Sequence, residues 1–190
     1  MKIKALTLTV ALAAALLSGC GGSGGPEQTS GFVEGSTGIT VVPAKDRQPA
    51  PTLSGDDLTG QALSTADWKG QTIVVNVWGP WCAPCRKEMP TLKEVSEQYA
   101  DQGVQFVGIV NRSKSDTSQA FVKKVGITYP TFADQGGRLE LKFNDTLPTI
   151  GVPTTWIIDS EGRVAVRIAV NDLTASTLAG LIDDVKKSVA

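Results

Sequence analysis

The sequence predicts an α/β fold in which helices flank a mixed central sheet. Residues 73–78 form a nearly continuous β-branched run, which is typical of a strand buried on both faces. From Pro84 to about Ala100, apolar residues recur at spacings of three and four, which indicates a helix. Later segments give the element order β-α-β-α-β-β-α. Such an order packs helices onto both faces of a sheet.

The elements around this first strand follow in chain order. Apolar residues at 53–54 and 61–63, separated by a stretch rich in Gly and Asp, predict a small hairpin. Residues 66–70 are expected to form a short turn into the central strand. After the first helix, residues 104–110 predict a second buried strand and residues 113–125 a second helix. The hairpin therefore precedes the central unit, and a further strand and helix follow it.

The C-terminal part completes the predicted sheet. Residues 129–132 are expected to form a short strand and residues 139–143 a short helix. Residues 154–158 and 164–170 are joined by Asp-Ser-Glu-Gly, a turn signal, and predict an antiparallel hairpin. Residues 174–189 carry apolar side chains on one helical face and predict an amphipathic helix that closes the chain. The antiparallel hairpin is what makes the predicted sheet mixed.

Two cysteines lie where the central strand passes into the first helix. The unpaired N–H groups and the positive dipole end of a helix N-terminus stabilise an anion. A thiolate there has a lowered pKa and is nucleophilic near neutral pH. Cys82, at the helix start, is the expected attacking thiol, and Cys85, one turn further in, is the expected resolving thiol. Pro84 fits the first helical turn, where a missing N–H costs nothing.

The other interpretations of this cysteine pair are half of a zinc site and a purely structural disulfide. A zinc site requires about two further Cys or His ligands. The chain has no histidine and three cysteines in total, so no metal site is expected, and a dithiol needs no organic cofactor. The net charge of −1 gives no electrostatic reason to expect nucleic-acid binding. Redox chemistry of the pair is the favoured interpretation.

Residues 1–19 are predicted to form a secretory signal peptide. Lys2 and Lys4 precede an apolar run, residues 5–17, that is short for a membrane-spanning helix. The run ends in Leu-Ser-Gly-Cys, which resembles a bacterial lipobox, so Cys20 is predicted to carry a lipid. Lipidation accounts for the odd third cysteine and anchors the protein to a membrane. An ordinary signal peptide with a cysteine near its cleavage site is the alternative.

Residues 20–44 are predicted to form the lipidated cysteine and a flexible tether, and residues 45–190 the folded domain. The tether is rich in Gly, Ser, Thr and Pro. Such a segment has a typical reach of roughly 25–30 Å. A short strand within residues 39–42, docked on the domain, is the alternative interpretation of its few apolar residues.

Two segments carry a resemblance to a known family. The run Asn-Val-Trp-Gly-Pro-Trp-Cys-Ala-Pro-Cys-Arg-Lys-Glu-Met-Pro, residues 76–90, and Gly-Val-Pro-Thr-Thr, residues 151–155, resemble the thioredoxin superfamily. The first run looks like its membrane-tethered TlpA/ResA/DsbE branch, and the similarity covers roughly residues 45–190. The resemblance implies a thioredoxin-like three-layer fold with an N-terminal hairpin and a central insertion at about residues 112–145.

The resemblance also implies site residues beyond the two cysteines. Pro153 matches a proline whose peptide bond is cis and which lies across from the dithiol. The backbone of Val152 is then expected to pair with an extended substrate. Thioredoxins proper have a buried aspartate where this chain has Asn76, which cannot titrate. Glu88, which matches a glutamate of the ResA-type motif, is therefore the expected proton acceptor for Cys85, with a pKa raised by partial burial.

Trp81 and Pro84, next to the cysteines, are expected to contact the substrate together with Val152. Structural interpretations stay open for two of the predicted site residues. Glu88 can be an exposed helix carboxylate without a special role, and Trp81 can be a core tryptophan.

The predicted function is thiol–disulfide exchange at the extracytoplasmic face of a bacterial membrane, in the reducing direction. The resemblance implies a membrane electron donor of the CcdA type and, as a client, the Cys-x-x-Cys-His segment of apocytochrome c. Formation of disulfides in secreted proteins is the alternative, because about 30 mV corresponds to only about 1.4 kcal/mol for a two-electron couple. A thiol peroxidase and a copper-delivery protein are less favoured, since the chain lacks a Thr-x-x-Cys setting and any histidine.

Overall fold

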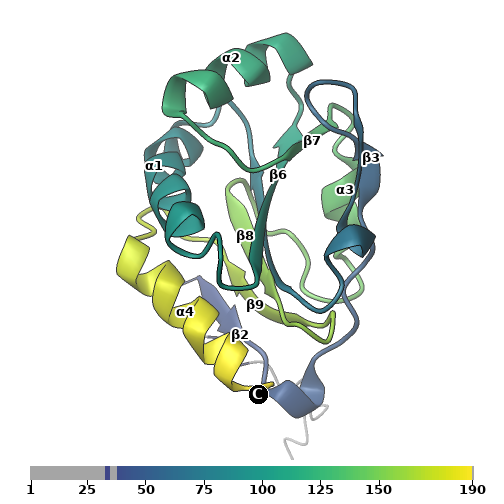
Figure 1. The fold of residues 1–190 in the computed structure, drawn as a ribbon, viewed down its shortest axis with the longest axis vertical. Helices are drawn as coiled ribbons and strands as arrows, with labels where there is room; N and C mark the ends of the chain where they lie inside the picture. The colour runs from purple at the N-terminus through teal and green to yellow at the C-terminus, as the bar shows by residue number, and fades with distance from the viewer. Residues whose placement is uncertain (1–32, 35–37, 190) are drawn as a thin grey trace, which may run out of the picture. The chain divides into compact units, whose positions relative to one another are not determined.

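The computed structural model describes residues 33–34 and 38–189 and contains the predicted α/β fold (Figure 1). Within these residues, seven strands form one mixed sheet in the order β1-β2-β9-β8-β5-β6-β7. β5 pairs in parallel with β6 and antiparallel with β8, so it lies inside the sheet. The strands of this sheet are β1 (Val33–Glu34), β2 (Ile39–Val41), β5 (Thr72–Trp78), β6 (Val104–Asn111), β7 (Thr131–Asp134), β8 (Thr154–Ile158) and β9 (Val164–Ile168).

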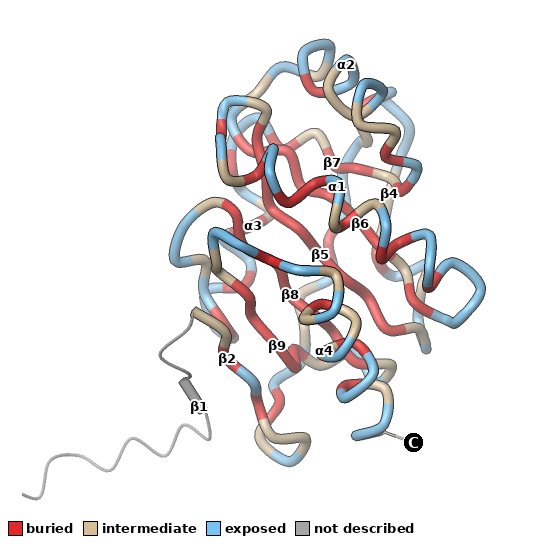
Figure 2. The backbone as a smooth tube through the Cα atoms, turned by 90° about the vertical axis from the view of Figure 1, so that its left-hand side faces the viewer, coloured by how far each residue is buried: buried red, intermediate tan, exposed pale blue. Residues whose placement is uncertain are grey.

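The side chains of β5 alternate between two hydrophobic cores, because successive residues of a strand point to opposite faces. Val74 and Trp78 lie in the core that includes residues of α1 (Ala83–Gln98) and α4 (Ala175–Lys187). Val75 lies in the core on the other face. Every residue of β5 is buried, and Figure 2 shows buried backbone along the central strands. This two-sided burial explains the nearly continuous apolar run.

The helices divide between the two faces of the sheet (Figure 1). α1 and α4 pack together on one face, where the Tyr99 hydroxyl donates a hydrogen bond to Asp183 at 2.7 Å. Phe121 of α2 (Ser115–Val125) packs against the same core. Leu139 of α3 and Leu63 of the predicted hairpin pack on the opposite core. The remaining elements are β3 (Ser54–Asp56), β4 (Ala62–Ser64), α3 (Arg138–Leu141) and the 3₁₀ helices Ala44–Asp46 and Thr65–Trp68.

β7 begins at Thr131, two residues after the predicted start at residue 129. Pro130 has no N–H to donate to a ladder. Its carbonyl accepts the Gly108 N–H at 3.0 Å, and regular pairing with β6 starts only at the next residue. The short helix is also displaced: α3 spans Arg138–Leu141, because the Asp134 carboxylate accepts the N–H groups of Arg138 and Leu139. Local side chains therefore set both boundaries.

The ordered domain begins earlier than the predicted boundary at residue 45. β2 pairs antiparallel with β9, so the alternative interpretation of residues 39–42 as a docked strand is confirmed and the tether interpretation is wrong for them. Gly38 enters this strand with φ +77°, and a Cβ there would lie 2.5 Å from the Ala169 carbonyl oxygen. Arg167 of β9 donates from one nitrogen to Thr40 Oγ1 at 2.9 Å and from another to the Pro148 carbonyl at 3.0 Å. The edge strand is thus bonded to the sheet through backbone and side chains.

The predicted signal peptide, Cys20 and most of the predicted tether lie outside the described residues. Lipid attachment at Cys20 therefore stays a prediction. Among the helices that the structure describes, none combines the length and the apolar character needed to cross a membrane.

Candidate active site

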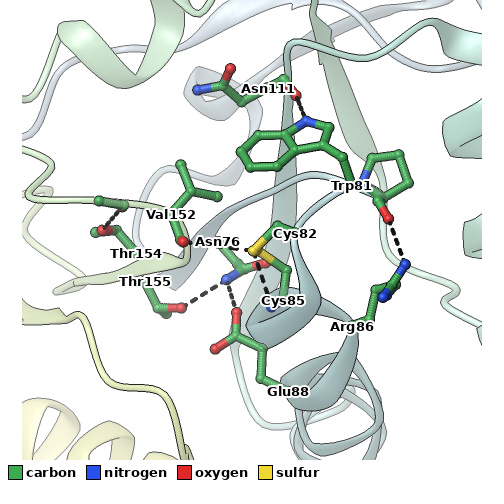
Figure 3. Close-up of a disulfide and its surroundings, with 12 residues drawn as sticks. Asn76, Trp81, Cys82, Cys85, Arg86, Glu88, Asn111, Val152, Thr154 and Thr155 are labelled. Atoms are coloured by element: carbon green, nitrogen blue, oxygen red, sulfur yellow. Dashed lines mark hydrogen bonds between the residues drawn. A yellow bond between two sulfur atoms is a disulfide. The ribbon is translucent and has the colours of Figure 1, made fainter.

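Cys82 and Cys85 form a disulfide at the N-terminus of α1 (Figure 3). The two sulfurs are 2.06 Å apart. Cys82 is the N-cap residue, and its sulfur accepts a hydrogen bond from the Cys85 backbone N–H at 3.2 Å. Cys82 is 4% exposed and Cys85 is fully buried. The helix N-terminus therefore directs one N–H at the outer sulfur, while the inner sulfur is enclosed by protein.

The basic residues of the motif lie away from the sulfurs. The guanidinium group of Arg86, an exposed residue, donates to the Pro80 carbonyl at 3.4 Å. Lys87 forms an exposed ion pair with Asp172. Pro84 is half-buried within the first turn of α1. The stabilisation available to a Cys82 thiolate thus comes mainly from the helix end and the Cys85 N–H.

The loop before β8 lies beside the disulfide. The Val152–Pro153 peptide bond is cis, as the resemblance implied. The Val152 carbonyl oxygen lies 3.6 Å from Cys82 Sγ, and Val152 is half-buried whereas Pro153 is buried. In the disulfide form, Cys82 Sγ carries no proton, so the two atoms are in van der Waals contact and not hydrogen-bonded. In the reduced form, the Cys82 thiol can donate a hydrogen bond to the same oxygen. The structure thus brings the predicted Val152–Pro153 pair next to the dithiol.

Glu88 is buried beneath the dithiol rather than exposed on the helix, with an exposed fraction of 4%. The Asn76 side-chain amide donates to Glu88 Oε1 at 2.9 Å and to Thr155 Oγ1 at 3.0 Å. Figure 3 shows the carboxyl group of Glu88 turned toward this amide. Burial raises the pKa of Glu88 to about 7, although the hydrogen bond from Asn76 lowers it. The position occupied by aspartate in thioredoxins proper therefore holds an amide that orients a carboxyl group from the helix.

This carboxyl group should make the stability of the oxidised protein depend on pH. Because the pKa of Glu88 is about 7 when folded and 4.5 ordinarily, the folded state binds more protons between these values. The free energy of unfolding therefore falls as the pH rises from about 4.5 to about 7, by on the order of 3 kcal/mol. Urea unfolding at about pH 5 and about pH 7.5 measures the fall. We expect Glu88→Gln to remove most of it; an equal fall in both proteins would contradict the burial of an ionisable group here.

Trp81 is 53% exposed, so it is not a core tryptophan. Its indole Nε1–H donates to the Asn111 carbonyl oxygen at 3.1 Å, and Figure 3 shows its ring next to the disulfide. The prediction that Trp81 contacts a substrate stays open, but the ring is accessible from solvent beside Cys82.

Several residues of this site were not singled out from the sequence. Thr155 shares the Asn76 amide with Glu88, and Asn111 holds the indole of Trp81. Tyr129 is buried near Glu88, and its pKa is raised first by burial and then by the charge of Glu88. No short-range signal marks these residues, because each meets the site only through sheet pairing or helix packing. Among the described residues, no group of three or more Cys, His, Asp or Glu side chains could hold a metal ion.

Residues 44–182 match the protein family described as Redoxin. The chain belongs to the Redoxin family. It is 33% identical over 115 residues to the thiol-disulfide oxidoreductase ResA of Bacillus thuringiensis subsp. konkukian (strain 97-27). That match covers 60% of this redoxin and 64% of the relative, slightly less than two thirds of the relative's length.

Solved structures agree with the fold of this redoxin. A DsbF homologue from Corynebacterium diphtheriae is 34% identical, with a TM-score of 0.69 over 79% of this chain and 94% of its own. A secreted thiol-disulfide isomerase from Corynebacterium glutamicum is 27% identical, with a TM-score of 0.70 over 79% of this chain and 92% of its own. The redoxin is thus a thioredoxin-superfamily protein of the ResA/DsbE type, which confirms the predicted family and fold. Two of these relatives are named as a thiol-disulfide oxidoreductase and a thiol-disulfide isomerase.

Proposed function

We propose that this redoxin is a thiol–disulfide oxidoreductase that reduces disulfides in client proteins. The observation that carries the proposal is the Cys82–Cys85 disulfide at the start of α1, with the Cys85 N–H directed at the outer sulfur. After reduction, the same N–H and the helix dipole stabilise a thiolate on Cys82. Opening and closing this one bond moves two electrons, which is the whole of the redox chemistry required.

The reaction proceeds in two exchange steps. The Cys82 thiolate attacks one sulfur of a client disulfide; a Cys82–client bond forms, the client S–S bond breaks, and the second client sulfur leaves as a thiolate that takes a proton from water. Cys85 then gives its proton to Glu88 and attacks the Cys82 sulfur. The Cys82–Cys85 bond closes, and the first client sulfur leaves and is protonated. The dithiol has passed two electrons and, in net terms, two protons to the client.

Glu88 is suited to accept the proton of Cys85 by its position and by its pKa. It follows Cys85 by about one helical turn, and Asn76 holds one of its carboxyl oxygens at 2.9 Å. A pKa of about 7 lets the group both accept a proton and release it near neutral pH. A more acidic carboxylate would be a poorer acceptor for a thiol proton.

The Cys82 thiolate is stabilised by the helix end without help from a neighbouring cation, and this moderate stabilisation favours the reducing direction. No cation of the motif contacts the Cys82 sulfur, since Arg86 and Lys87 bond elsewhere. An ionised Glu88 adds a like charge beneath the dithiol and further disfavours a thiolate. Strong oxidants of this class owe their potential to a stabilised reduced form, so a less stabilised one gives a more reducing couple.

The reduction potential tests this direction. Equilibration of the protein in glutathione buffers of defined ratio, followed by alkylation of free thiols, gives the fraction reduced. We expect a potential below about −220 mV, toward the roughly −270 mV of thioredoxin. Glu88→Gln should raise the potential, because it removes a negative charge beside the thiols. A wild-type value near −120 mV, as in the oxidant DsbA, would replace the reductase proposal by the oxidase alternative.

We further propose that the protein acts at the extracytoplasmic face of a bacterial membrane, anchored through a lipid on Cys20. The basic start, the apolar run and the lipobox-like sequence support this location, as does the word "secreted" in the name of the Corynebacterium glutamicum protein. The resemblance to the TlpA/ResA/DsbE branch implies a CcdA-type membrane donor, which would return two electrons to the disulfide, and apocytochrome c as a client. The Cys-x-x-Cys-His segment of apocytochrome c can pair as an extended strand with the backbone of Val152.

A further inference from the structure

Trp81 combines high exposure with a fixed orientation. Its indole N–H donates to the Asn111 carbonyl oxygen at 3.1 Å. The ring also folds back over Gly79 so closely that a Cβ on that residue would lie 2.5 Å from the indole nitrogen. An exposed tryptophan would ordinarily sample several rotamers, whereas these two contacts hold this ring in one.

The acceptor of this bond is fixed by its own side chain. Asn111 is the last residue of β6 and is 3% exposed. Its side-chain amide donates to Glu140 Oε1 at 2.5 Å. The chain turns sharply after it, because Arg112 has φ +50°. The orientation of the Asn111 carbonyl therefore depends on how the side chain of Asn111 is held at this turn.

Glu140 reaches the site from the central insertion. It lies on the one-turn helix α3 and is 8% exposed. The Asp134 carboxylate, which accepts two N–H groups at the start of α3, fixes the place of that helix. Gly137 comes close enough that a Cβ there would lie 3.4 Å from Glu140 Oε1. The insertion thus presents one buried carboxyl group to Asn111.

We propose that Asn111 and Glu140 are positioning residues that fix the Trp81 indole beside Cys82 as a preformed apolar contact for the client. The role of the ring toward a client rests on the proposed function; the hydrogen-bonded chain from Glu140 to Trp81 does not. An indole that is already ordered loses little rotamer freedom when a client docks, and this preorganisation lowers KM rather than raising kcat.

Indole NMR tests the structural half of the proposal. In the ¹⁵N-labelled oxidised protein, the Nε1–H resonance of Trp81 is assigned by its loss in Trp81→Phe. We expect Glu140→Ala to shift this resonance and to speed its exchange with water by roughly fivefold or more, because the local structure opens more often. Glu140→Gln keeps an acceptor oxygen and should restore the wild-type resonance. Leu141→Ala, at the neighbouring exposed residue of α3, is the matched control.

Kinetics with a disulfide-bonded peptide test the other half. Glu140→Ala should raise KM about 2- to 10-fold with little change in kcat. Gly79→Ala displaces the same ring without touching α3, so it should raise KM similarly even if Glu140→Ala does not fold. An unchanged indole resonance in Glu140→Ala overturns the positioning chain. A displaced indole with wild-type KM in both variants overturns the client contact. A wild-type protein inactive with every disulfide tested would defeat the proposed function, while the NMR result would still stand.

Discussion

Replacement of Cys85 by serine is expected to turn the protein into a trap that keeps its client as a mixed disulfide. The first exchange needs only Cys82, whereas release of the client needs the second sulfur. Cys82→Ser removes the attacking atom and should lower the rate of disulfide reduction by at least about 1,000-fold. Non-reducing electrophoresis followed by mass spectrometry, with the reduced variants added to an extract of unfolded extracytoplasmic proteins, would detect the adducts.

The paired variants make the result specific. Cys82→Ser keeps the buried inner thiol and should form few adducts, because Cys85 is fully enclosed in the structure. Adducts of similar number in both variants would mean that the assignment of attacking and resolving thiols is wrong. If neither variant forms adducts while the wild type reduces a test disulfide, the extract lacks a client and the chemical assignment rests on the rates alone.

The second large effect concerns stability. It is expected at Asp159, in the turn that joins β8 to β9, at the end of β8 away from Pro153. Asp159 is fully buried and forms ion pairs with Arg47 at 3.1 Å and Arg163 at 3.0 Å. It also accepts the backbone N–H groups of Glu161 and Arg163, which close the turn. Asp159→Ala leaves the buried Arg47 guanidinium without its carboxylate and should lower the free energy of unfolding by about 3–5 kcal/mol. Urea unfolding of the oxidised protein near pH 7 measures the loss.

Asp172→Ala is the matched control for this prediction. Asp172 also pairs with a basic residue, Lys87, but both side chains are exposed. Exposed pairs contribute about 0–1 kcal/mol, so this variant should unfold almost like the wild type. Losses of equal size in Asp159→Ala and Asp172→Ala would show that burial does not govern the strength of these pairs.

The sequence was sufficient to predict the elements whose apolar pattern extends over many consecutive residues. The bounds of β5 and α1 were predicted within one or two residues. At the cysteine motif, a continuous apolar run typical of a buried strand gives way to apolar residues at helical spacings of three and four. The residues of β2 were predicted as part of the tether, with a docked strand only as the alternative, because three residues in a Gly- and Thr-rich segment become a strand only when β9 offers an edge. The start of β7 was shifted by Pro130, whose effect depends on its partner strand.

The same distinction applies to the candidate site. The two cysteines and the cis proline lie in short motifs and could be identified by spacing and resemblance. Glu88 was predicted as a site residue from the resemblance, but its orientation by Asn76 depends on the packing of α1 against β5, which no local pattern shows. Asn111 and Glu140 could not be found at all, since 28 residues separate them and their meeting depends on the insertion. Residues that act by holding another residue leave no periodic signal.

The low exposure of Cys82 has a consequence for the timing of client reduction. With 4% of Cys82 exposed, a reacting sulfur must be brought to a recessed atom beside the Val152 carbonyl. A client disulfide in an extended or exposed segment can approach this atom, whereas a disulfide buried in the core of a folded protein is shielded by its own surroundings. We therefore expect unfolded clients to be reduced faster than folded ones. Folding of the client therefore competes with reduction of its disulfide, and a client that folds first keeps that disulfide.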